Sequence, residues 1–444
     1  MYLSAGRAAD IAADTPPRTG PVRAVPGTVF ALGLVSLVTD VSAEMVTAVL
    51  PLYLVAGLGM SPLAFGALDG LQQGATALLR LLGGRVADRT RRRKLVAGAG
   101  YALSAACKAA LLAVTTPWSV AAVLAADRTG KGLRTAPRDA LISLSCAPGE
   151  QGRAFGVHRA MDTAGALLGP LAAFGVLWVA PDGYDAVFTV SCCFAVLGVV
   201  LLALFVREAP APPVSPSPTP APSAPAPPAP APPAAPALAA GAVPPASAVR
   251  SLLRLPELRR LCLTAAALGV FTVGDAFLYL LLQRRLDLPL AWFPLLPVGT
   301  AAVFLLAALP VGRLADRLGR RRVFLAGHLL MLGACLLLLA PLPAGPALAC
   351  AGVAVVALLG LFYAATDGVL MAAAAPLLPP GLRTTGLAVL QTAQALARFA
   401  GSLLFGAAWT LWGPGAALAA AACGLLLALA ATSAFGGPEV GGAP

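Results

Sequence analysis

Long apolar stretches alternate with short charged segments along the chain, apart from its two ends and one central segment. A helix that crosses the hydrocarbon of a bilayer needs about 20 mostly apolar residues. Twelve stretches meet this requirement, in two groups of six. The predicted spans cover residues 28–56, 62–84, 95–114, 117–144, 153–178 and 184–206, followed by 260–283, 290–311, 323–341, 346–374, 384–409 and 414–435. The pattern therefore predicts an all-α membrane protein with 12 transmembrane helices in two six-helix bundles.

The composition agrees with this prediction. Hydrophobic residues make up 59% of the 444 residues and charged residues 11%, whereas soluble domains carry roughly 25% charged residues because their surface faces water. No cleavable signal peptide is visible in the first 27 residues, so we expect the transmembrane helices themselves to direct insertion. The eight cysteines have neither metal-ligand nor disulfide spacing, and we interpret them as small buried hydrophobic residues. We expect no metal site and no cofactor.

The net charge of +12 comes mainly from arginine clusters between the apolar stretches. Clusters at 85–93, 250–260 and 313–322 alternate with segments poor in charge, as the positive-inside rule requires. We therefore expect a multi-pass protein of the cell membrane with both termini in the cytoplasm, and no nucleic-acid partner. Arg284 and Arg285 are an exception, because they fall on the predicted outer side. The tryptophans support the orientation, since all lie at predicted outer helix ends: Trp118, Trp178, Trp292, Trp409 and Trp412.

The central segment consists mainly of Pro, Ala, Ser and Val and has no hydrophobic period. Such a segment cannot bury a core, so we predict a disordered cytoplasmic linker. The alternative is a ligand for a proline-recognition domain. The predicted division is an N-terminal tail (1–27), a first bundle (28–206), the linker (207–250), a second bundle (251–436) and a C-terminal tail (437–444).

Two motifs recur at nearly the same spacing, which indicates an internal duplication. Gly84-Arg-Val-Ala-Asp88-Arg89-Thr-Arg-Arg92-Arg93 after the second span matches Gly312-Arg-Leu-Ala-Asp316-Arg317-Leu-Gly-Arg320-Arg321 after the eighth, an offset of 312 − 84 = 228. Arg153-Ala-Phe-Gly156 and Arg383-Thr-Thr-Gly386 precede the fifth and eleventh spans, an offset of 383 − 153 = 230. The offsets predict a parallel repeat of one six-helix unit, an arrangement in which two halves rock about a central site.

With these motifs the chain resembles the major facilitator superfamily over nearly its whole length, because the family signature G-x-x-x-D-R-x-G-R-R/K has a counterpart in both halves. Arg128-Thr-Gly-Lys-Gly132 is similar to the family's fourth-helix motif. Gly165-Ala-Leu-Leu-Gly169-Pro170 is similar to a fifth-helix motif that the family associates with exporters exchanging substrate for protons. The resemblance implies the family's fold, in which helices 1, 4, 7 and 10 line a central cavity.

The loop motifs and the fifth-helix motif are our candidates for conformational gating. The candidates are Gly84, Asp88, Arg89, Arg92, Gly312, Asp316 and Arg317 in the loops, and Gly165, Gly169 and Pro170 in the helix. Acids at helix ends can face a helix N-terminus or pair with arginine, and such contacts can hold one conformation of the two halves. The glycines allow close helix approach. The alternatives are that the loop residues only set topology and that the glycines only serve packing.

Charged residues inside transmembrane helices are unfavourable in lipid and tend to mark pathways. Asp40 and Glu44 lie four residues apart on one face of the first helix. Asp40 and Arg128 lie at similar depth, so we expect Asp40 to pair with Arg128 or Lys131. Asp40 and Glu44 are our candidates for proton binding, and the alternative is a static charge pair. The candidates for the substrate cavity are Arg128, Lys131, Arg134, Asp275, Tyr363, Asp367, Gln391 and Arg398.

Further charges lie toward the predicted inner ends of the fourth and fifth helices. We expect Arg138 and Asp139 to extend to the inner interface. We expect Arg159 or Asp162 to pair with the fourth helix or with the first loop motif. Lys108 has no evident partner in the sequence.

These features favour secondary active transport of a small organic molecule, with export coupled to inward proton flow. The basic residues of the fourth helix favour an alternative, an importer or exchanger of an anionic solute. A third class is a non-transporting sensor or scaffold with the transporter fold. No nucleotide-binding loop, metal cluster or nucleophile–base pair occurs in the sequence, so we expect no enzymatic activity. The expected partners are a small-molecule substrate, protons and the lipid bilayer, and we expect a monomer.

Overall fold

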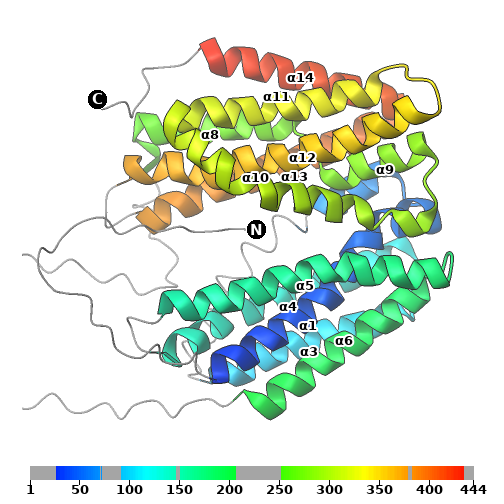
Figure 1. Cartoon of the computed structure of the whole chain (residues 1–444), viewed down its shortest axis with the longest axis vertical. Coiled ribbons are helices and arrows are strands. Elements are labelled where there is room, and N and C mark those ends of the chain that lie inside the picture. The colour runs from blue at the N-terminus through cyan, green and yellow to red at the C-terminus, as the bar shows by residue number, and fades with distance from the viewer. Residues whose placement is uncertain are drawn as a thin grey trace, which may run out of the picture.

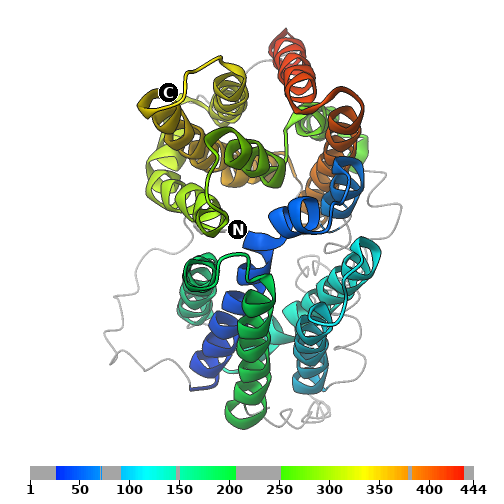
Figure 2. The same cartoon turned by 90° about the vertical axis from the view of Figure 1, so that its right-hand side faces the viewer.

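The computed structural model describes residues 27–70, 72, 92–146, 151–206, 252–378 and 383–434. These residues form helices joined by short connections, with no strand among them. The helices are arranged in two bundles, one from each half of the chain (Figure 1). Figure 2 views the molecule from the right-hand side of Figure 1, along the helices of both bundles. The predicted linker and nearly all of both predicted tails lie outside the described residues, so the division into domains stays a prediction.

The first bundle contains six helical segments. They are α1 (Gly27–Leu52), which the π-helical turn η1 (Tyr53–Gly57) continues, a helix over 62–70, α3 (Arg93–Leu111), α4 (Pro117–Leu144), α5 (Gln151–Val179) and α6 (Tyr184–Phe205). The start of α4 follows directly from its sequence. The side-chain oxygen of Thr116 accepts a hydrogen bond from the backbone N–H of Ser119, and Pro117 occupies the first turn, where its missing N–H is not needed.

The second bundle repeats this plan with one difference. Its elements are α8 (Pro256–Phe271), α9 (Asp275–Leu286), η3 (Leu290–Trp292), α10 (Leu295–Leu318), α11 (Arg320–Leu339), α12 (Pro346–Ala374), η4 (Ala375–Leu377), α13 (Arg383–Trp412) and α14 (Pro414–Ala434). The predicted span over 260–283 is present, but it is broken in the middle, because Thr272 and Gly274 have extended backbone between α8 and α9. The break leaves Asp275 in the first turn of α9, where the helix dipole favours an acidic residue.

The two bundles share the same pattern of helix neighbours. In the first, α1 packs against α5 and α6, and α3 against α4 and α6. In the second, α8 packs against α13 and α14, and α11 against α12 and α14. Even a helix cap is repeated: Lys94 Nζ donates to the carbonyl of Ala203 at 3.0 Å, and Arg321 donates to that of Thr432 at 2.6 Å. The donors are 321 − 94 = 227 residues apart and the acceptors 432 − 203 = 229, close to the offsets of the sequence motifs.

Within the described residues, eight helical segments are long and apolar enough to cross a membrane. They cover Gly27–Gly57, Arg153–Val179, Tyr184–Phe205, Pro256–Leu286, Leu290–Leu318, Arg320–Leu339, Pro346–Ala374 and Pro414–Ser433. The predicted spans 62–84, 95–114, 117–144 and 384–409 are not among them. Most of 62–84 lies outside the described residues, and α4 carries six charged residues that lower its hydropathy. Their contacts, described below, lie inside the protein, so α4 can stand among lipid-facing helices.

The structure bears on two details that were used to predict the orientation, the tryptophans and the two exceptional arginines. Trp118, Trp178 and Trp412 are exposed at helix ends, but Trp409 is buried against Phe277 and Phe405, so its assignment to an interfacial belt is wrong. The exceptional arginines at the end of α9 have local roles. Arg284 stacks over the Trp409 ring at 5.4 Å, and Arg285 donates to the carbonyl of Ala340, which follows α11.

The bundles contact each other at the end of the molecule that carries η1 and η3, which we call the η3 end. The backbone N–H of Leu63 donates to Thr410 Oγ1 at 3.1 Å. The rings of Trp178 and Trp292 meet with centroids 6.4 Å apart. In Figure 1 this end lies on the right, where α9 approaches the first bundle. The helices α5 and α10 also pack against each other across the two halves.

Candidate functional site

Acidic residues of α1 pair with basic residues of α4 inside the first bundle. Asp40 Oδ1 lies 3.6 Å from Arg134 Nη2, and Glu44 Oε1 lies 3.9 Å from Lys131 Nζ. The Arg134 side chain is only 5% exposed, and its guanidinium stacks over the Tyr101 ring at 4.5 Å. The structure therefore places both predicted proton-binding candidates beside cations of the predicted fourth helix.

Asp40 forms its ion pair with Arg134 and not with Arg128 or Lys131 as predicted, although Lys131 also acts on Asp40 electrostatically. Arg128 instead donates to Gln72 Oε1 at 3.1 Å and to Thr47 Oγ1 at 3.5 Å. Helical periodicity explains the difference. The charged residues Asp127, Lys131, Arg134 and Arg138 follow the spacing i, i+4, i+7, i+11 and share one face of α4, whereas Arg128 lies about 100° away from that face.

Arg138 joins α4 to α1 and α5. It contacts Asp139 at 3.0 Å and Asp162 at 3.7 Å, and it donates to Ser36 Oγ at 2.9 Å. Ser36 Oγ in turn lies 3.0 Å from Nε2 of the buried His158. The expected pairing of Asp162 with the fourth helix is confirmed. The expectation that Arg138 extends to the inner interface is wrong, since its side chain is buried among these partners.

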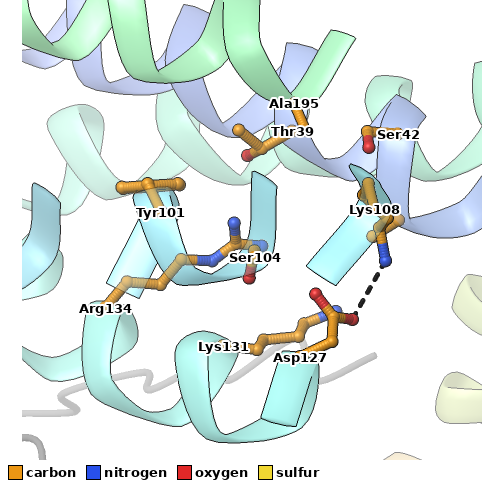
Figure 3. Close-up of a pocket in the computed structure, with 10 residues that line it drawn as sticks. Thr39, Ser42, Tyr101, Ser104, Lys108, Asp127, Lys131, Arg134 and Ala195 are labelled. Atoms are coloured by element: carbon orange, nitrogen blue, oxygen red, sulfur yellow. Dashed lines mark hydrogen bonds and ion pairs between the residues drawn. The ribbon is translucent and has the colours of Figure 1, made fainter. Parts of the chain in front are cut away.

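A more completely buried ion pair lies in the same bundle, and it was not predicted from the sequence. Lys108 Nζ on α3 donates to Asp127 Oδ2 at 3.0 Å, and both side chains are almost completely buried. Figure 3 shows Lys108 pointing from α3 to Asp127 at the edge of a small polar pocket. The pocket is lined by Thr39, Ser42, Ala43, Tyr101, Ser104, Lys108, Asp127, Lys131, Arg134 and Ala195. The position of Asp127 on the charged face of α4 was the signal that could have revealed this pair.

The second bundle brings its candidate residues together in two contacts. The Tyr363 hydroxyl donates a hydrogen bond to Asp275, which joins α12 to the start of α9. Arg398 Nη2 on α13 lies 3.7 Å from Asp367 Oδ1 on α12. Gln391 has a contact of 3.8 Å from its amide nitrogen to Met371 Sδ and no described link to these pairs. Tyr363 and Asp275 thus form one polar contact and Asp367 and Arg398 another, and their place in a substrate cavity stays a prediction.

The loop candidates are described in part. Gly84, Asp88 and Arg89 lie outside the described residues, and Arg92 is the exposed residue before α3. In the second copy, Asp316 pairs with Arg320 at 3.2 Å, and Arg320 also donates to the carbonyl of Ala372. Arg317 is exposed, and Gly312 has open space where a side chain would begin. The described contacts of Asp316 and Arg320 thus lie within the second bundle.

The fifth-helix glycines bring α5 against α1. A Cβ atom added to Gly165 would lie 2.4 Å from the carbonyl oxygen of Leu37, and one added to Gly169 would lie 2.8 Å from that of Val41. Pro170 lies inside α5 directly after this contact. The predicted close helix approach is confirmed, while a gating role for these three residues stays a prediction.

One acidic residue of the predicted second span was also missed. Asp69, in helix 62–70, accepts a hydrogen bond from Ser402 Oγ on α13 at 3.0 Å. This bond joins the two bundles. The signal in the sequence was a single carboxyl group in an otherwise apolar stretch.

A family model described as Major Facilitator Superfamily matches residues 32–402 and 292–441 of the chain. An uncharacterized MFS-type transporter of Methanocaldococcus jannaschii is 35% identical over 185 residues, which is 41% of this chain and 46% of that protein. The multidrug resistance protein MdtH of Edwardsiella ictaluri is 32% identical over 114 residues, 26% of this chain and 28% of that protein. These alignments span less than half the length of the curated relatives.

Solved structures show the same fold at low sequence identity. The nucleoside transporter NupG superposes with a TM-score of 0.70 at 14% identity, over 92% of this chain and 98% of that one. A bacterial homolog of the human lysosomal transporter Spinster, inward-facing and occupied, has a TM-score of 0.61 at 16% identity, over 92% and 93%. The family match, the repeated bundles and the apolar helices agree on a multi-pass membrane protein. The chain belongs to the major facilitator superfamily.

Proposed function

We propose that the protein is a secondary transporter that exports a small organic solute across the cell membrane by alternating access, in exchange for protons. The observation that carries the proposal is the set of carboxylate–cation pairs on α1 and α4, Asp40 with Arg134 and Glu44 with Lys131. The resemblance to the family implies that these two helices line the central cavity, which supports the proposal. In this proposal the protein acts as a monomer, with both termini in the cytoplasm and the η3 end outside.

The geometry separates exchangeable pairs from a fixed one. Charge-assisted N–H···O hydrogen bonds are about 2.7–2.9 Å long. Lys108 and Asp127 approach this at 3.0 Å and are hydrogen-bonded, so we assign them a structural role. The contacts of Asp40 and Glu44, at 3.6 and 3.9 Å, are longer ion pairs without a direct hydrogen bond. A longer ion pair loses less attraction energy when its members separate. Asp40 and Glu44 are therefore better suited to release their cationic partner and bind a proton.

Proton exchange at Asp40 would act on the fourth helix. When Asp40 is ionised, it attracts Arg134; when it is protonated, that attraction is lost and the Arg134 guanidinium remains in a buried site. Asp162 on α5 is a further carboxyl neighbour of Asp40, and it also pairs with Arg138 at 3.7 Å. Protonation of Asp40 would therefore change how α1, α4 and α5 hold one another, which is the link that coupling requires.

The substrate would bind between these residues and those of the second bundle. We propose Arg128, Lys131 and Arg134 from the first half, and Asp275, Tyr363, Asp367, Gln391 and Arg398 from the second. Both halves offer cations and carboxyl groups, so a solute with polar groups of both kinds fits better than a purely apolar one.

Proteoliposomes with a transmembrane pH gradient test the coupling. A panel of solutes is first screened for thermal stabilisation of the purified protein, and a stabilising solute is then used in transport. Addition of that solute should move protons in the wild type, whereas Asp40→Asn should bind the solute and move none. The matched control is Asp287→Asn, which changes an exposed carboxyl group at the η3 end. Unchanged proton movement in both Asp40→Asn and Glu44→Gln would remove these residues from the mechanism.

One observation favours a second candidate function, the import or exchange of an anionic solute. The described hydrogen bonds of Arg128 go to neutral groups, Gln72 and Thr47. Its guanidinium could exchange them for a carboxylate or phosphate at little loss. Under this alternative, Arg128→Gln abolishes binding of the stabilising solute and the solute carries net negative charge. Under proton-coupled export, Asp40→Asn reduces solute-driven proton movement more than Arg128→Gln does.

A further inference from the structure

The contact between helix 62–70 and α13 is so close that three glycine positions along it have no room for a side chain. A Cβ atom added to Gly66 would lie 2.3 Å from the carbonyl oxygen of Ser402, and one added to Gly70 would lie 2.4 Å from the Phe399 ring. From the other side, a Cβ on Gly406 would lie 2.4 Å from the carbonyl oxygen of Pro62. The two halves of the protein therefore meet backbone to backbone along this line.

Asp69 lies between the two glycines of its helix and points into this contact. Its Oδ2 atom accepts the Ser402 hydroxyl at 3.0 Å, across the two halves. The same oxygen lies 3.4 Å from the position that a Cβ on Gly274 would occupy. Gly274 precedes the first turn of α9, so the carboxyl group of Asp69 faces the start of that helix.

The charged groups around Asp69 come from both halves. Arg128 of α4 and Arg398 of α13 act on it electrostatically, and Asp275 of α9 is a neighbouring acid. Asp275 is held by the Tyr363 hydroxyl. The charge of Arg398 is shared with Asp367, and Arg128 is bonded to Gln72 and Thr47. Closure of the η3 end thus brings the carboxyl groups of Asp69 and Asp275 close to each other from opposite halves. The two arginines near Asp69 already contact other residues.

We infer that Asp69 is a second proton-binding group, whose protonation holds the two halves together at the η3 end. The inference rests on the proposed proton coupling and adds a site to it. Separation of the halves at this end breaks the bond to Ser402 and opens Asp69 to water, which favours the ionised carboxylate. Closure removes part of that water and adds the repulsion of Asp275, both of which favour the protonated form, whereas Arg398 and the start of α9, which closure also brings near, oppose it. A protonated Asp69 still accepts from Ser402 with its carbonyl oxygen.

This arrangement would couple proton uptake to one step of the cycle. A proton that binds Asp69 while the η3 end is open allows that end to close, and the closed protein then opens at the opposite end. Arg128, Arg398 and the start of α9 favour the ionised form, so they allow the proton to leave again.

Pulsed electron–electron double resonance, which measures the distance between two spin labels, can report closure of the η3 end. Spin labels are attached at Val179→Cys on α5 and Leu411→Cys on α13, which are 83% and 74% exposed, after replacement of the eight native cysteines. In the wild-type background the short-distance population should grow as the pH falls from about 8 to about 5. In Asp69→Asn, which is permanently neutral, that population should dominate at both pH values. The control Asp287→Asn should follow the wild type.

A second pair of variants tests the hydrogen bond itself. Ser402→Ala should lower the ratio of closed to open protein about fivefold at low pH, the effect of one ordinary hydrogen bond. Ser433→Ala, at an exposed position on α14, should leave the ratio unchanged.

The outcomes separate this inference from the proposed function. If the wild type and Asp69→Asn respond to pH equally, Asp69 is not the group, while coupling through Asp40 survives. If the wild type shows no response to pH, the inference is overturned. Proton movement in proteoliposomes then decides separately whether the protein is proton-coupled at all.

Discussion

The two halves have the same helix arrangement but very different interiors. In the first half, buried or partly buried ion pairs connect α1, α3, α4 and α5: Asp40–Arg134, Glu44–Lys131, Lys108–Asp127 and Asp162–Arg138. The described interior of the second half has Asp367–Arg398 and the Tyr363–Asp275 hydrogen bond within a mostly apolar core. A duplicated unit thus retained its packing while its interior charges diverged. Helix packing and proton chemistry are therefore separate properties of this fold, and each can be disturbed without the other.

The largest effect on the free energy of unfolding is expected at the buried Lys108–Asp127 pair of the first half. Asp127→Ala leaves the Lys108 ammonium buried without its partner, which destabilises a protein by about 3–5 kcal/mol. In the second half, Asp367→Asn breaks a partly exposed pair at 3.7 Å and should cost less than about 1 kcal/mol. The free energy of unfolding, measured by SDS titration in mixed micelles, compares the two variants.

The double variant Lys108→Met with Asp127→Leu serves as the control, because it removes both charges and fills a similar volume. It should recover most of the lost stability. Equal losses in Asp127→Ala and Asp367→Asn would contradict the contrast between the two interiors.

Properties that repeat along the chain were predictable from the sequence. Apolar runs located the eight spans that the described residues support, and the two offsets of the motifs revealed the duplication that the caps at Ala203 and Thr432 confirm. The glycine spacing of the fifth helix predicted its close contact with the first, because small residues permit that approach whatever the partner.

Properties that depend on which side chains meet were not predictable in the same way. Asp69 and Ser402 are 333 residues apart, and no local pattern indicates that their helices touch. The break before Asp275 has no proline to mark it. The partner of Asp40 was misjudged because depth along the helix was considered without the angle around it, although the charged face of α4 from Asp127 to Arg138 is visible in the sequence.

Substitutions at the glycine contacts should lower the free energy of unfolding equally in the two halves. The expected loss is smaller than that of Asp127→Ala. Gly165 of α5 meets the Leu37 carbonyl, and Gly401 of α13 meets that of Val270; an added Cβ would lie 2.4 Å from the oxygen in both cases. Gly165→Leu and Gly401→Leu should each lower the free energy of unfolding by about 1–3 kcal/mol, because the helices must move apart.

Gly312→Ala is the matched control, since nothing lies within 4 Å of its added Cβ, and alanine raises helix propensity. It should leave stability equal or slightly higher. A loss in Gly165→Leu without one in Gly401→Leu would mean that the two packing contacts are not equivalent, and the separation of packing from chemistry would fail.

The smallest effect is expected at the repeated helix caps. Lys94 and Arg321 each donate to a carbonyl in the last turns of α6 and α14, where the helix dipole also favours a cation. Lys94→Met and Arg321→Met keep the apolar stem and lose the donor, so each should destabilise by about 0.5–1.5 kcal/mol. Lys131→Met has the same change of side chain in the charged interior and leaves Glu44 without its ion-pair partner. If the caps are equivalent, the two cap variants lose similar stability and keep solute-driven proton movement, whereas Lys131→Met impairs that movement. Loss of proton movement in a cap variant would instead tie the repeated scaffold directly to coupling.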